Sequence, residues 1–143
     1  MTEQEEQEFL SLIDCGDGNH YSFLGLMPFS EFNLDSYNKR LNYLKMEVTD
    51  TQLKYNGLKF INFAKATLSN KLKKTSYDLQ LRKKLKRKLI LLIEFAVSID
   101  NTLTSIEREQ LDVFGNRFGF SSMEVNAIIE EQRKKHHFNS SIS

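Results

Sequence analysis

Apolar residues in this chain recur at steps of three and four, which is the spacing of one face of an α-helix, and sustained alternation typical of strands is missing. Thr104 precedes Glu107 by three residues, a capping-box pattern that opens a helix. The predicted helices cover residues 3–14, 33 or 35 to 48, 51–68, 71 or 76 to 99, 105–117 and 121 or 122 to 135, with a short turn of helix at 21–25. The pattern therefore predicts an all-α protein of about six helices.

The same periodicity predicts which side chains form the core. The expected core faces are Leu34, Tyr37, Leu41, Leu44 and Val48; Leu58, Ile61, Ala64 and Leu68; Leu81, Leu85, Leu89, Leu92 and Ala96; Ile106, Leu111 and Phe114; and Met123, Val125, Ile128 and Ile129. Phe60 and Phe63 lie off the face of their helix, so burial on two sides is expected there. Cys15 is expected to be a small buried side chain.

Composition limits the class of protein. The chain has 143 residues, 40% of them hydrophobic and 27% charged, which suits one domain or two small helical units. A single cysteine allows no intrachain disulfide and favours a reducing compartment. The first residues lack a signal-peptide pattern, and the longest apolar run is too short to span a bilayer. We therefore expect a soluble intracellular protein, nuclear or cytoplasmic, with no membrane contact.

Charge is nearly balanced overall, at +1, but unevenly placed. Glutamates crowd residues 3–8, whereas residues 82–88 are almost wholly basic. The candidate surface for a partner or for nucleic acid consists of Arg82, Lys83, Lys84, Lys86, Arg87 and Lys88. These cations can contact phosphates, an import receptor or an acidic protein, or can form an ordinary solvated helix face.

Residue patterns for catalysis or metal binding are weak. No glycine-rich phosphate loop, nucleophile elbow or paired catalytic acids occur, so the chain is not expected to be an enzyme or to bind a cofactor or a small-molecule substrate. His136 and His137 lack a third ligand nearby for zinc. Asp100 and Glu107 are too few for a hard cation, which takes six or more oxygens, so no metal site is expected.

Two short motifs carry a resemblance to a known family. The first is Tyr21-Ser22-Phe23-Leu24-Gly25, and the second, about fifty residues on, runs from Leu68-Ser69 through a lysine pair to Tyr77-Asp78. The set resembles a DnaJ-type J domain over residues 19–79. The resemblance implies a helical hairpin whose core includes Tyr21, Leu24, Leu41, Ile61, Leu68 and Tyr77.

The resemblance lacks one part of the family pattern. The His-Pro-Asp tripeptide that working J domains use to stimulate their chaperone ATPase should fall between the second and third helices, where Met46 to Asp50 stand instead. Lys39, Arg40 and Lys45 retain positive charge on the second helix, most simply as a solvated face. The resemblance thus implies a degenerate J-like scaffold kept for packing or for a partner.

A second resemblance covers residues 89–131. An apolar helix, the turn Ile99-Asp100-Asn101 and a capped helix from Thr104 are similar to part of a TerB-like helical domain. Only about three helices of that domain are represented, and asparagine replaces its usual glycine at the turn.

Together these patterns predict an acidic N-terminal helix (1–18), a J-like unit (19–79), a basic helix with a TerB-like hairpin (80–135) and a flexible tail (136–143). The expected function is a non-catalytic adaptor or accessory subunit that binds and stabilises a protein partner in a hetero-complex. One alternative is an accessory subunit of a nuclear DNA- or RNA-acting complex that uses the basic helix. Another is a J-like cochaperone that recruits a heat-shock ATPase without stimulating it.

Overall fold

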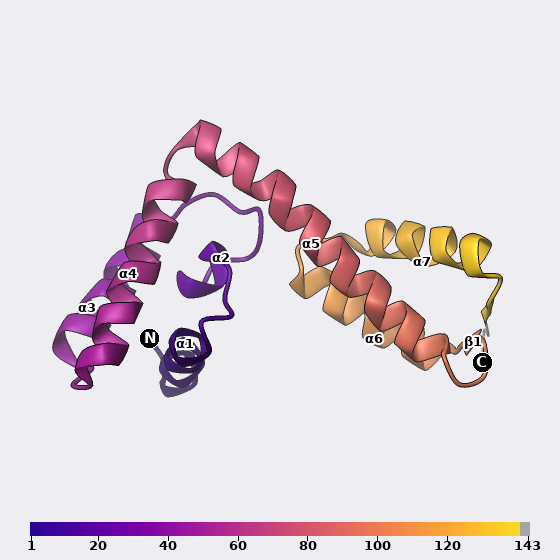
Figure 1. Cartoon of the computed structure of the whole chain (residues 1–143), viewed down its shortest axis with the longest axis horizontal. Coiled ribbons are helices and arrows are strands. Elements are labelled where there is room, and N and C mark those ends of the chain that lie inside the picture. Colours follow the sequence, from indigo (N-terminus) through magenta and orange to yellow (C-terminus); the bar gives the residue numbers. More distant parts are fainter. Residues whose placement is uncertain (141–143) are drawn as a thin grey trace. The chain divides into compact units, whose positions relative to one another are not determined.

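The protein is all-α, as the apolar periodicity predicts. The computed structural model describes residues 1–140. The elements are α1 (Glu3–Cys15), α2 (His20–Phe23), α3 (Leu34–Met46), α4 (Thr51–Leu68), α5 (Lys71–Val97), β1 (Thr102–Leu103), α6 (Ser105–Arg117), α7 (Ser122–His136) and β2 (Asn139–Ser140) (Figure 1). Within the described part, no helix is long and apolar enough to cross a membrane.

The chain forms two compact units, and the boundary between them along the sequence falls between Asp78 and Leu79. The boundary falls inside α5, so the first two turns of this helix belong to the first unit and the rest to the second. The acidic N-terminal helix is part of the first unit, because α1 packs against α2 and α4.

The centre of the first unit is the pair α3 and α4. Asn33 and Asp50 cap the two helices by accepting hydrogen bonds from backbone N–H groups of the first turn. The Tyr37 hydroxyl donates to Asn62, and Lys54 Nζ donates to the carbonyl of Lys45. Because residue numbers fall along α3 as they rise along α4, the two helices form an antiparallel hairpin (Figure 1).

Helix α1 closes one side of this hairpin with Phe9 and Ile13, both buried. Close approach is possible because position 57 has no side chain. A Cβ added to Gly57 would lie 2.7 Å from Leu44 Cδ2 and 2.9 Å from Ile13 Cδ1. The core of the first unit therefore depends on a small residue in the middle of α4.

Several core expectations in this unit are wrong. Leu34 is exposed because it is the first residue of α3, and helical side chains point toward the N-terminal end, here past the helix. Leu41 and Leu58 are only half-buried. Of the two phenylalanines expected to be buried, Phe60 stacks on Phe23 but Phe63 is exposed. Cys15 is also exposed, at the last residue of α1.

The second unit consists of the rest of α5 with α6 and α7. Both bonds of the predicted capping box form between Thr104 and Glu107, and Ser121 with Glu124 caps α7 in the same way. Its core contains Leu81, Leu85, Leu89 and Ile93 of α5, Leu111 of α6, and Val125 and Ile129 of α7. Leu92 and Ala96, expected on the α5 core face, are half-buried, and Ile93 takes the buried position.

Three residues expected in the core of this unit are not buried. Ile106 and Phe114, expected inside, are exposed on α6, and Met123 is exposed at the start of α7. In the described part of the predicted tail, His136 is the last residue of α7, and Phe138 is buried. Thr102 and Leu103 pair in parallel with Asn139 and Ser140. Residues 141–143 of the predicted tail lie outside the described residues.

Candidate interaction surfaces

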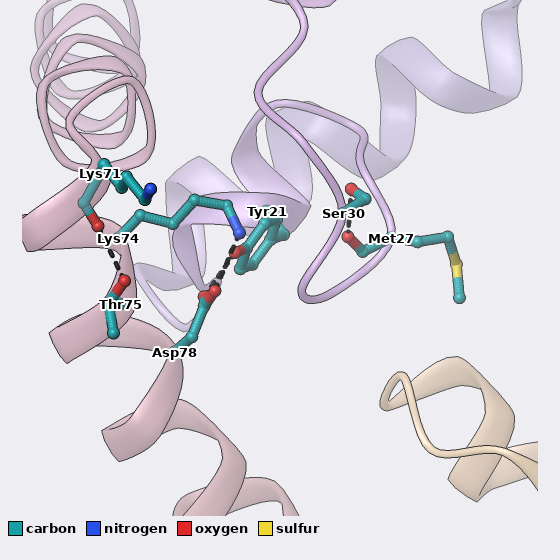
Figure 2. Close-up of polar contacts among 7 residues, drawn as sticks. All are labelled: Tyr21, Met27, Ser30, Lys71, Lys74, Thr75 and Asp78. Carbon is teal, nitrogen blue, oxygen red and sulfur yellow. Dashed lines mark hydrogen bonds and ion pairs between the residues drawn. The ribbon is translucent and has the colours of Figure 1, made fainter.

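The two J-like sequence motifs meet in the first unit. Figure 2 shows the Tyr21 hydroxyl, from α2, donating a hydrogen bond to the Asp78 carboxylate of α5. Lys74 Nζ lies 2.9 Å from the other oxygen of Asp78. One residue away, the Tyr77 hydroxyl accepts from the backbone N–H of His20 at 2.9 Å. Residues that are 57 apart in sequence thus fasten the start of α5 to α2.

Burial sets the protonation states in this cluster. The pKa of Tyr21 is raised, first by burial and then by its hydrogen bond to Asp78. Burial also raises the pKa of Tyr77 and lowers the pKa of His20, whose ring lies 4.3 Å from that of Tyr77. At neutral pH the phenols and the imidazole are therefore uncharged. The side chains of this cluster are packed and hydrogen-bonded, and they attach the start of α5 to α2.

The loop after the first motif is held by its own turn. As Figure 2 shows, the Ser30 hydroxyl donates to the Met27 carbonyl, and the two oxygens are 2.6 Å apart. The same view shows the Thr75 hydroxyl bonded to the Lys71 carbonyl in the first turn of α5. Both contacts are local and stabilise backbone.

The predicted J-like core positions are mostly interior. Tyr21, Leu24, Ile61 and Leu68 are buried, whereas Leu41 and Tyr77 are half-buried. The connection between α3 and α4, where the tripeptide is missing, consists of residues 47–50. Its Val48 is buried and its Asp50 caps α4. The residues of this connection therefore serve to pack against the core and to cap α4.

The charge expected on α3 is partly hidden. Lys39 and Lys45 are exposed, but Arg40 is buried with its guanidinium 4.6 Å from the centre of the Phe9 ring. Burial lowers the pKa of Arg40, while Glu5 and Glu8 of α1 act in the opposite direction. The expectation of a solvated basic face is wrong at this position, because α1 covers it.

The basic run divides into paired and unpaired cations. Arg82 hydrogen-bonds Glu124 of α7 and lies over the Phe120 ring, and Lys86 Nζ is 3.7 Å from Glu131. Lys83, Lys84, Arg87 and Lys88 are exposed, and none of the four has an ion pair within residues 1–140. Two of the six predicted surface cations thus contact α7, and the other four are exposed and without an ion pair in the described residues.

Electrostatic contacts also join α6 to α7. Arg108 bonds Asn126 and Glu130, and Ser122 bonds Asp112. The pKa of Glu130 is lowered by its hydrogen bonds to Arg133 and Arg108, and that of Glu124 by the Ser121 backbone N–H and then by Arg82. The carboxylates along α7 are therefore used to attach the helix to its neighbours.

The two acidic residues weighed as metal ligands have structural roles. Asp100 accepts from the Thr102 N–H at 3.1 Å, and Glu107 accepts from the Thr104 N–H at 3.0 Å. Within residues 1–140 no group of three or more histidine, cysteine, aspartate or glutamate side chains is arranged to hold a metal ion.

The apolar surface of the second unit is the feature that sequence reasoning missed. Leu91 and Phe95 of α5, Ile99 in the turn after α5, and Ile106 of α6 are each more than half exposed. The signal was present, because Leu91 and Phe95 are four residues apart and off the Leu81–Leu85–Leu89 stripe.

Comparison with family models, with curated proteins and with solved structures finds no match to this chain.

Proposed function

We propose that this protein is a non-catalytic helical adaptor or accessory subunit, which binds a protein partner and stabilises it within a larger assembly. The observation that carries the proposal is the exposed apolar surface of the second unit, at Leu91, Phe95, Ile99 and Ile106. Leu91 and Phe95 are one helical turn apart, and exposed apolar side chains that adjoin in this way are typical of protein-interaction sites. Covering one such side chain contributes about 1.5–3 kcal/mol.

The first unit supports the same proposal. Its two motifs are joined by a part-buried hydrogen bond between Tyr21 and Asp78, and the connection between α3 and α4 is used for capping and packing. A J-like framework without His-Pro-Asp would keep the shape of that fold while losing ATPase stimulation. In this proposal the first unit is a scaffold that carries the second unit in the same chain and binds the partner protein.

The test is purification of the tagged full-length chain from its own cells, with quantitative mass spectrometry and size-exclusion chromatography. A second protein in near-stoichiometric amount, which co-elutes with the chain at physiological salt, is the expected result. The matched control is the same tag on an unrelated helical protein. Elution of the chain alone, at the size of a monomer, would overturn the proposal.

A second candidate function is supported by the four exposed cations Lys83, Lys84, Arg87 and Lys88. An accessory subunit of a DNA- or RNA-acting complex would place this side of α5 against phosphates. Four phosphate contacts predict a slope of about −3.6 in a plot of log affinity against log salt for duplex DNA. Reversing the four charges should remove the slope, while reversal of the exposed Lys39 and Lys45 should not. No duplex binding at low salt would eliminate this candidate.

A further inference from the structure

Helix α4 of the first unit has an exposed side on which two aromatic rings flank a lysine. Tyr55 and Phe63 are each 64% exposed. Lys59, between them, is exposed and forms no ion pair within residues 1–140. The three residues are four apart, so each stands about 40° further round the helix than the one before it. They form a continuous row, called here the α4 row.

The α4 row lies away from the core of its unit. The buried residues of this helix are Gly57, Ile61, Ala64 and Leu68. At about 100° per residue, Tyr55 and Lys59 point almost directly away from them. Phe63 points to the flank where α2 packs, and its ring centre lies 5.3 Å from that of His20. Both aromatic residues therefore keep most of their surface open to solvent.

The charge along this part of the chain has one sign. Residues 51–77 include no aspartate or glutamate, and their lysines are Lys54, Lys59, Lys65, Lys71, Lys73 and Lys74. Every residue of α4 within one turn of the α4 row is therefore uncharged or basic. The acidic helix α1 reaches α4 on its buried side, where Ile13 lies against Gly57. The charge of α4 itself thus favours an anionic ligand.

The side chains beside the rings indicate what kind of anion fits. The exposed amides Gln52 and Asn62 and the Lys59 ammonium separate the rings, so the rings do not form the contiguous apolar patch of a protein contact. Exposed aromatic rings stack on nucleic-acid bases, and basic side chains contact the phosphates that join those bases. A duplex hides the faces of its bases, which leaves a single strand as the matching ligand.

We infer that the α4 row binds single-stranded nucleic acid, with one base stacked on Tyr55, another on Phe63 and the phosphates of the intervening strand at Lys59. The rings are eight residues apart, about 12 Å along the helix axis, so the strand is extended where it crosses them. This inference goes beyond the adaptor function, and it depends neither on that function nor on the four exposed cations of α5.

The test separates the α4 row from the basic run of α5. It uses the full-length chain and a full-length glutamine variant, in which Lys83, Lys84, Arg87 and Lys88 are all replaced by glutamine. The probes are a fluorescein-labelled oligothymidylate of about 15 nucleotides and a labelled DNA duplex with the same number of phosphates. Fluorescence anisotropy is measured across a salt series. The glutamine variant should bind the single strand at low salt, at least about fivefold more tightly than the duplex, because only unpaired bases stack on the rings.

Exposed positions allow substitutions that leave the core intact. In the glutamine variant, Tyr55→Ala and Phe63→Ala should each weaken single-strand binding at least about fivefold, whereas Tyr55→Phe, which keeps the ring, should bind normally. Lys59→Gln should make the slope of log affinity against log salt shallower by about 0.7. The matched controls are Phe95→Ala, at an exposed ring of α5, and Lys39→Gln, at an exposed lysine of α3, and both should bind normally. Circular dichroism checks that every variant is folded.

Four outcomes would overturn the inference. Loss of binding in the glutamine variant would assign the wild-type binding to α5, and equal affinity for single strand and duplex would remove the role of stacking. Unchanged affinity in Tyr55→Ala and Phe63→Ala would show that the site lies elsewhere. Polyglutamate that displaces the oligonucleotide as well as unlabelled oligothymidylate does, at equal charge, would make an acidic protein the ligand. None of these results decides the adaptor proposal, which the purification above tests.

Discussion

Replacing Gly25 with alanine tests the packing of the first unit most directly. Gly25 has φ +69°, a left-handed conformation, and a Cβ added there would lie 2.2 Å from Arg40 Nη2. Arg40 is buried and held over the Phe9 ring, so its guanidinium has little room to move. Gly25→Ala therefore imposes two separate penalties, one on the backbone and one on the packing.

The two penalties can be separated by a matched glycine. Left-handed backbone costs an alanine about 1–2 kcal/mol, and overpacking costs about 1–3 kcal/mol more. Gly16 has a similar φ of +64°, but nothing lies within 4 Å of its added Cβ. We expect Gly25→Ala to lower the free energy of unfolding by about 2–5 kcal/mol and Gly16→Ala by about 1–2 kcal/mol.

Tyrosine fluorescence in urea measures this unit alone. The chain has no tryptophan, and its five tyrosines are Tyr21, Tyr37, Tyr43, Tyr55 and Tyr77. All precede the boundary at Asp78, so the signal reports unfolding of the first unit, and linear extrapolation gives its free energy.

A double-mutant cycle completes the test. In an Arg40→Ala background the clash is gone, so Gly25→Ala should there cost only as much as Gly16→Ala. The reasoning is refuted if the two glycine variants are equally stable in the wild-type background. It is also refuted if Arg40→Ala leaves the cost of Gly25→Ala unchanged.

Three further predictions concern the hydrogen bond between Tyr21 and Asp78 and the contact between α6 and α7. Tyr21→Phe removes the hydrogen bond to Asp78 and should lower the free energy of unfolding by about 1–3 kcal/mol in the same urea assay, and an unchanged value would contradict a fastening role. Because burial and Asp78 raise the pKa of Tyr21, its folded form favours the neutral phenol. The stabilisation is fully present below about pH 10 and is lost as pH rises above it, so urea midpoints measured from pH 8 to 11 should fall only at the alkaline end, and less so in Tyr21→Phe. Gly115→Ala places a Cβ 2.2 Å from Val125 Cγ2, so overpacking of about 1–3 kcal/mol should exceed the helix-propensity gain of about 1 kcal/mol. Thermal unfolding by circular dichroism should then show a lower midpoint than that of the exposed neighbour Asn116→Ala, and a higher midpoint would contradict it.

Local patterns predict the helices well, because caps and periodicity act within a few residues. The helix Thr51–Leu68 has the expected limits, and the Thr104–Glu107 capping box forms with both of its bonds. The four-residue step of Leu81, Leu85 and Leu89 also correctly identifies the buried side of α5.

Contacts between distant segments are what the sequence could not supply. Arg40 is charged, which favours a surface position, but it stands three residues after Tyr37 and four before Leu44, and it is buried because α1 covers it. Phe114 stands three residues after Leu111 on α6, but periodicity cannot say which side of the helix a neighbouring helix covers, and Phe114 is exposed. The bond between Tyr21 and Asp78 joins residues 57 apart, so the motifs suggested a shared core without specifying the contact.

The ordered end of the described chain limits where the protein can be shortened or tagged. Phe138 is 3% exposed, and Asn139 and Ser140 pair with Thr102 and Leu103 next to it. A stop codon after His137 would remove a core aromatic ring and an edge strand together, so loss of the last few residues would loosen the second unit. A fusion partner is better tolerated at the N-terminus, where the first two residues are exposed.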